Sequence, residues 1–122
     1  MEIDEVIAFS ETLPYVEKEY KADWEAVLLK VGGKMFVLIP LDSTAGPVIN
    51  LKCDPERAEE LRMHYDAIVP GFHMNKRHWN TLYLRNNLNR NLVEELIRHS
   101  YELVFKGLTQ KVRSALIGST GQ

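Results

Sequence analysis

The sequence predicts an α+β fold, a two-layer sandwich in which helices pack on one face of an antiparallel sheet. The first observation is Gly32-Gly33 between two apolar segments. This pattern is typical of a β-hairpin, because a type I′ turn needs positive φ at both central residues. The second is that further strand-like segments follow short turns, which favours antiparallel pairing. The third is that amphipathic helical segments occur early and late in the chain, and their apolar faces need a sheet to cover.

Three helices are predicted from apolar spacing and capping residues, at 3–13, 54–64 and 91–108. Pro14 ends the first helix, because proline cannot continue the backbone hydrogen bonding. Asp54 followed by Pro55 begins the second, since Asp caps free amides and Pro fits the first turn. Asn91 with Glu94 resembles a capping box at the start of the third.

Four strands are predicted, at 24–31, 34–41, 48–53 and 79–84, together with a short extended segment at 68–70. Met35–Ile39 is apolar on both faces, which indicates a strand covered on both sides. Residues 15–23 are charged and aromatic without a clear period, and we expect an irregular crossing there. Residues 1–113 are predicted to form a single domain, followed by a flexible C-terminal tail at 114–122.

Composition limits the class of protein. The chain has 122 residues, 45% hydrophobic and 26% charged, as expected for one globular domain with a real core. No apolar segment is long enough to cross a membrane, and the acidic start does not resemble a signal peptide. Cys53 is the single cysteine, so no internal disulfide can form. We therefore expect a cytoplasmic protein, monomeric and without a cofactor.

Charge is distributed unevenly around a net value of −2. Residues 1–26 contain eight acidic residues and two lysines, whereas residues 68–113 contain eight Lys or Arg and three Glu. Such asymmetry allows a basic face with an anionic partner, although many solvated surfaces share it. A pI near 6.1 is lower than that of a typical nucleic-acid-binding domain.

The densest group of chemically versatile residues lies at 70–80, which reads as a structured loop leading into a strand. Lysine supplies a point charge and arginine a two-pronged donor, and both suit phosphate. Amides add hydrogen bonds, and a tryptophan either stacks on a base or packs in the core. The candidate nucleic-acid-binding residues are Lys52, His73, Asn75, Lys76, Arg77, His78 and Trp79.

Two other chemistries are compatible with residues of the same region. A pocket lined by His73, His78 and Cys53 could bind a small ligand, or pair a thiol with a base, if these residues meet in space. Cys53 beside a strand end is more typical of a buried small hydrophobe, so no catalytic residue is assigned. Metal-binding motifs such as C-x-x-C are absent from the sequence, and no metal site is predicted.

Four segments together resemble the MmcQ/YjbR family of small bacterial proteins. They are Gly32-Gly33-Lys34-Met35-Phe36, Asn50-Leu51-Lys52-Cys53-Asp54-Pro55, His73-Met74-Asn75-Lys76-Arg77-His78-Trp79 and His99-Ser100-Tyr101. The resemblance extends from the first helix to about Arg113, and the third segment is long and unusual. It departs from the family pattern at 86–91, where amides replace the more acidic turn expected there.

The resemblance implies a CyaY-like, frataxin-like fold, in agreement with the sandwich predicted above. The family is commonly labelled DNA-binding, so the resemblance implies a non-enzymatic protein whose partner is DNA. A protein partner that contacts the same loop, or the acidic first helix, is the alternative. Frataxin-like proteins are also associated with iron at acidic surfaces, but carboxylates such as Glu2, Asp4, Glu5 and Glu11 are ordinary on an exposed helix.

Overall fold

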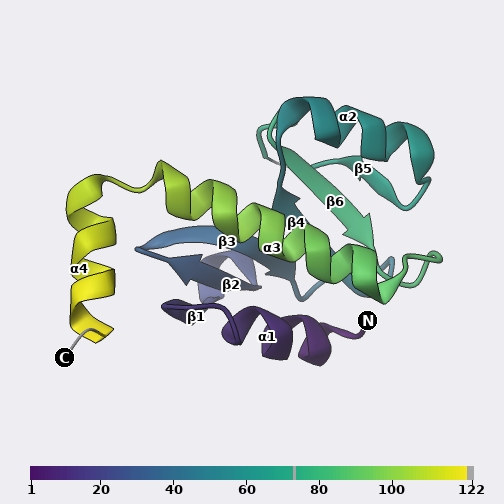
Figure 1. Cartoon of the computed structure of the whole chain (residues 1–122). Coiled ribbons are helices and arrows are strands. Elements are labelled where there is room, and N and C mark those ends of the chain that lie inside the picture. The colour runs from purple at the N-terminus through teal and green to yellow at the C-terminus, as the bar shows by residue number, and fades with distance from the viewer. Residues whose placement is uncertain (73, 121–122) are drawn as a thin grey trace.

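The computed structural model describes residues 1–72 and 74–120, and shows a six-stranded antiparallel sheet with helices on one face (Figure 1). The predicted α+β two-layer sandwich is confirmed. In chain order the elements are α1 Ile3–Glu11, β1 Val16–Lys21, a 3₁₀ turn at Ala22–Trp24, β2 Ala26–Val31, β3 Lys34–Pro40, β4 Val48–Lys52, α2 Pro55–His64, β5 Ile68–Pro70, β6 Trp79–Tyr83, α3 Arg90–Gly107 and α4 Gln110–Thr120.

The sheet has the strand order β1-β2-β3-β4-β6-β5. Gly32 and Gly33 join β2 to β3 with φ values of 59° and 82°, the left-handed conformation that the predicted hairpin turn requires. β6 pairs with β4 along five residues, although α2 and β5 separate the two strands in the sequence. Residues 48–52 and 79–83 are therefore neighbours in space.

Strand β1 was not predicted, and the expectation of an irregular crossing at 15–23 is wrong for residues 16–21. β1 pairs with β2 along its whole length and forms one edge of the sheet. An edge strand with mostly exposed or half-buried residues does not need the apolar alternation that identifies a covered strand. Its charged sequence Val-Glu-Lys-Glu-Tyr-Lys is typical of such an edge.

The hydrophobic core lies between the sheet and helices α1, α2 and α3. Alternate residues along the strands point into it, among them Leu29, Ile39 and Ile49, which are 0% exposed. α3 crosses the middle of the sheet and contributes the widest apolar stripe (Figure 1). α2 covers the part of the sheet near β5 through Ala58 and Leu61.

Strands β3 and β4 pair through only two residues each, Val37 with Leu51 and Leu38 with Asn50. Beyond this point Ser100 of α3 lies between the strands. Its hydroxyl donates to the Phe36 carbonyl at 2.6 Å and accepts from the Lys52 amide at 2.9 Å. The side chain of a helix thus replaces a rung of the sheet and fixes the end of β4.

The start of α3 and the C-terminal tail differ from their predictions. Asn89, not Asn91, caps α3, because its side chain accepts from the amides of Asn91 and Leu92. Residues 114–120, predicted as part of a flexible tail, belong to helix α4, while residues 121–122 lie outside the described part. Val112 and Leu116, spaced four apart, pack against the core and explain why this segment is helical.

Candidate nucleic-acid interface

The loop from Gly71 to Trp79 is closed by its own backbone. The Gly71 amide donates to the Trp79 carbonyl at 2.9 Å, and the amides of His78 and Trp79 both donate to the Asn75 carbonyl. The Asn75 side-chain oxygen accepts from the Arg77 amide at 3.0 Å, which is a local turn typical of asparagine. Asn75, predicted to bind a ligand, therefore has a structural role in which its side-chain carbonyl is already used.

The two loop cations differ in their surroundings. The Lys76 ammonium donates to the Gly71 carbonyl at 3.0 Å, across the loop. Arg62 of α2 donates to the Lys76 carbonyl and holds the same segment from the other side. Arg77 is exposed. Lys76 therefore helps to close the loop, whereas Arg77 extends from its surface.

Lys52 and Trp79, two residues of the predicted set, meet in the structure. They are directly opposite each other in the β4–β6 pairing. With Lys34, Met35, Val104 and Gly107 they line a pocket of about 330 Å³ at the end of the sheet. The sequence predicts Lys34 as the residue after the hairpin turn, and its place near Lys52 comes from the pocket that both residues line.

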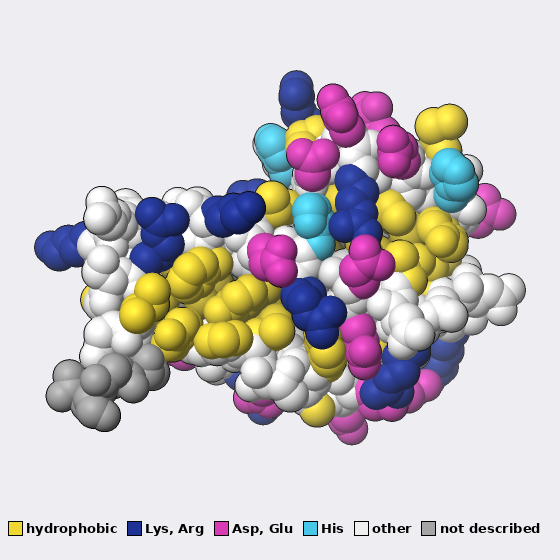
Figure 2. Space-filling model, viewed as in Figure 1, with side chains coloured by type: hydrophobic (Ala, Val, Ile, Leu, Met, Phe, Trp, Pro, Cys, Tyr) yellow, Lys and Arg dark blue, Asp and Glu magenta, His cyan; other side chains and the backbone are white. Residues whose placement is uncertain are grey.

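Two further cations, Lys106 and Arg113, lie near this pocket. Lys106 precedes the pocket residue Gly107, and Arg113 of α4 donates to the Lys106 carbonyl at 3.4 Å. Figure 2 shows Lys and Arg side chains gathered over the junction of α3 and α4. We call the surface formed by Lys34, Lys52, Lys106 and Arg113 the basic edge.

Within residues 1–72 and 74–120, no carboxylate forms an ion pair with a cation of the basic edge. The ion pairs of this described part involve Lys30, Arg57, Arg85 and Arg90 instead. Cations without carboxylate partners remain available for an external anion. The basic edge can therefore provide several charges to a polyanion, while an aromatic ring lies next to Lys52.

The proposed thiol–histidine pocket is only partly described, because His73 lies outside the described residues. The Cys53 amide donates to the His78 carbonyl at 2.7 Å, so the two backbones are adjacent. The Cys53 side chain is only 4% exposed, and burial raises the pKa of its thiol to about 11. A thiol in this state is a poor nucleophile, because the thiolate is the reactive form.

Cys53 should resist modification in the folded protein. At pH 8 a pKa of about 11 leaves roughly one thiol in a thousand ionised, and the core blocks access. Titration with a chromogenic disulfide reagent should give a slow reaction in buffer and one rapid equivalent in denaturant. Rapid stoichiometric reaction of the native protein would contradict this assignment and restore the small-ligand alternative.

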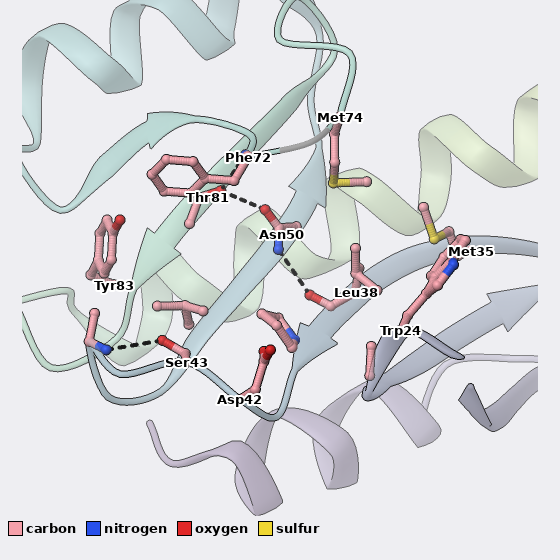
Figure 3. Close-up of a pocket in the computed structure, with 14 residues that line it drawn as sticks. Trp24, Met35, Leu38, Asp42, Ser43, Asn50, Phe72, Met74, Thr81 and Tyr83 are labelled. Carbon is pink, nitrogen blue, oxygen red and sulfur yellow. Dashed lines mark hydrogen bonds between the residues drawn. The ribbon is translucent and has the colours of Figure 1, made fainter. Parts of the chain in front are cut away.

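A second and larger pocket lies on the face of the sheet that the helices leave uncovered. It measures about 610 Å³ and opens between the β-sheet, the loop residues Phe72 and Met74, and the turn at 41–47 (Figure 3). Phe72, Met74 and Trp24 contribute to its walls, and Asn50 and Thr81 to its floor. We call it the sheet-face pocket; the sequence signal for it was the apolar character of β3 on both faces.

Hydrogen bonds join the floor of the sheet-face pocket to the loop. Thr81 donates to the Asn50 side-chain oxygen at 2.5 Å, and the Asn50 amide group donates to the Leu38 carbonyl at 3.4 Å (Figure 3). The Phe72 amide donates to the Thr81 hydroxyl at 3.3 Å. The position of the Phe72 backbone is thus set by two buried polar side chains of the sheet.

Comparison with known proteins decides the family. The YjbR family model matches residues 11–103. This chain belongs to the YjbR family. Within this family it is 37% identical to the uncharacterized protein YbdF of Escherichia coli O157:H7, over 81% of this chain and 80% of that protein. It is 31% identical to the uncharacterized protein YjbR of E. coli K12, over 96% and 98% of the two chains.

Solved structures share the fold of this YjbR-family chain. The crystal structure of protein DR2400 from Deinococcus radiodurans matches with a TM-score of 0.85 and 36% identity, covering 94% of this chain and 87% of that one. A Pseudomonas syringae protein matches with a TM-score of 0.74 and 25% identity, covering 84% and 98%. The resemblance seen in the sequence motifs is therefore confirmed for both family and fold.

No group of three or more His, Cys, Asp and Glu residues within 1–72 and 74–120 is arranged to hold a metal ion. In the same part of the chain, no helix has the length and apolar character needed to span a membrane.

Proposed function

We propose that this YjbR-family chain binds nucleic acid through phosphate contacts at the basic edge, and that it acts by binding without catalysis. The observation that carries the proposal is the pocket where Lys34 and Lys52 lie with Trp79. Lysine ammonium groups bind phosphate as point charges, and an aromatic ring beside them can contact a sugar or base. The basic edge thereby retains Lys52 from the predicted set, with Trp79 beside it in the pocket, and adds three cations.

The remaining predicted residues have supporting positions in this proposal. Arg77 is exposed and can extend the phosphate contacts from the loop. Lys76 and Asn75 support the loop through internal hydrogen bonds. His78 binds Cys53 through its backbone, which holds the loop against the end of β4.

Reversing two charges on the basic edge should weaken binding and its salt dependence. Each phosphate contact contributes close to 0.9 to the slope of log affinity against log salt for duplex DNA, and about 0.7 for a single strand. The Lys34→Glu/Lys52→Glu variant should therefore lower the slope by about 1.8 for duplex and by about 1.4 for a single strand. It should also reduce affinity at low salt by more than about tenfold. Fluorescence anisotropy with random-sequence labelled duplex and single strand measures both quantities.

The matched control is Lys18→Glu/Arg85→Glu, which changes net charge equally at exposed positions away from the pocket. This control should keep the slope of the unaltered protein. Equal losses in both double variants would indicate an effect of net charge and reject the basic edge. No binding of either probe at low salt would reject nucleic-acid binding itself.

A further inference from the structure

The sheet-face pocket and the basic edge are neighbouring parts of one surface. Side chains two residues apart on a strand share a face and lie about 7 Å apart. Asn50 and Thr81 of the pocket floor are two residues from Lys52 and Trp79 on β4 and β6. Met35 lines both pockets. A ligand bound along the basic edge can therefore continue directly into the sheet-face pocket.

The walls of the sheet-face pocket are aromatic and unusually exposed. Trp24 is 51% exposed and Phe72 is 55% exposed, and Tyr83 is a third ring in the lining. Figure 3 shows Phe72 and Tyr83 on one side of the pocket and Trp24 on the other, with Asn50 and Leu38 between them. Large exposed rings around a concave surface are typical of a site that binds a flat, partly apolar group.

The two ends of this combined surface carry opposite charges. Among the described residues that line the sheet-face pocket, Asp42 carries the charge, and Figure 3 shows it at the end away from Met35 and Met74. A carboxylate repels phosphate but accepts hydrogen bonds from N–H groups of bases, including the ring N3–H of thymine. Lys34 and Lys52 lie beyond Met35, at the opposite end. The surface therefore suits a ligand with a base at one end and phosphates at the other.

We propose that the sheet-face pocket accepts an unstacked base of single-stranded nucleic acid whose phosphates lie on the basic edge. This inference rests on the proposed function and names its ligand class. The bases of a duplex are stacked and paired, so their faces cannot reach rings such as Trp24 and Phe72. Base–aromatic stacking tolerates any sequence, because every base has a flat face.

The test uses probes that separate bases from phosphates. They are a labelled oligodeoxythymidylate, an abasic strand of equal length and a duplex of equal length. The unaltered protein should bind the thymidylate strand more tightly than either other probe. The Trp24→Ala/Phe72→Ala variant should lose at least about fivefold of its affinity for this strand, with an unchanged salt slope. Its affinity for the abasic strand should stay the same.

Tyr20→Ala is the matched control, because Tyr20 is 60% exposed on β1 and does not line the pocket. It should not change affinity for any probe. Binding that depends on Lys34 and Lys52 but not on Trp24 and Phe72 would overturn this inference and leave the proposed function standing. A preference for duplex would overturn it as well. Absence of binding to all three probes at low salt would overturn both proposals.

Discussion

Replacing Ser100 with alanine should lower the free energy of unfolding by about 2–5 kcal/mol, because two buried backbone groups lose their partner. The Ser100 hydroxyl accepts from the Lys52 amide and donates to the Phe36 carbonyl, at the point where β3 and β4 stop pairing. Ser100 is 0% exposed, so water cannot easily replace it. The midpoint and slope of urea denaturation, followed by circular dichroism, give the change in free energy.

Ser10→Ala is the matched control for this measurement. Ser10 is also 0% exposed, but its hydroxyl donates only to the Val6 carbonyl one turn earlier in α1. That helical carbonyl has a second acceptor site used by the backbone, so the loss should stay below about 1 kcal/mol. Similar losses for the two serines would show that Ser100 does not replace a rung of the sheet.

The Ser100→Ala variant should also alter the basic edge. Ser100 fixes the backbone of Lys52, whose side chain lines the pocket with Lys34 and Trp79. A displaced Lys52 should weaken nucleic-acid binding in protein that remains folded at low temperature. If affinity is unchanged while stability falls, the position of Lys52 does not depend on this hydrogen bond.

Replacing Arg62 with methionine should cost about 2–4 kcal/mol of stability, because Arg62 joins α2 to the loop and to β6. Its Nε donates to the Asn80 side-chain oxygen at 2.7 Å, and its Nη2 donates to the carbonyls of Lys76 and Trp79. Asn80 is 2% exposed, and its Nδ2 has no partner in the described residues. Without Arg62 the whole buried amide would be unsatisfied.

Arg57→Met provides the control from the same helix. Arg57 pairs with Glu95 at 2.6 Å, but the Glu95 side chain is 58% exposed, and such surface pairs contribute less than about 1 kcal/mol. Hydrogen exchange should show faster exchange of the amides of residues 75–79 in Arg62→Met only. Unchanged exchange in that segment would mean that the loop is held by its own hydrogen bonds.

The sequence was sufficient for features fixed by neighbouring residues. Gly32-Gly33 adopts the positive φ values that the hairpin needs, and Asp54 caps α2 by accepting from the Arg57 amide. In β4, Ile49 and Leu51 lie in the core and Asn50 lies on the opposite face, as the two-residue period of a strand requires. The sandwich follows from these local choices, because each amphipathic element has one apolar face to bury.

Sequence patterns did not predict elements whose residues are largely exposed, because such elements lack a regular spacing of apolar residues. β1 lies at the edge of the sheet and has no apolar alternation, so only its hydrogen bonds to β2 identify it. Asn89 and Asn91 are both suitable caps, and the start of α3 depends on which side chain reaches the free amides. Val112 and Leu116 needed the core beside them before a helix at 110–120 became evident.

The candidate site was decided by tertiary structure. The sequence by itself determined the family, the sandwich, and the presence of Lys52 and Trp79 in segments that form strands. Only the pairing of β4 with β6 placed these two residues opposite each other, because that register joins segments far apart in the chain. Only the folded loop showed that Lys76 donates to its own backbone, since the acceptor depends on the path of the chain. A sequence gives the charges and donors, while their partners depend on distances that folding alone sets.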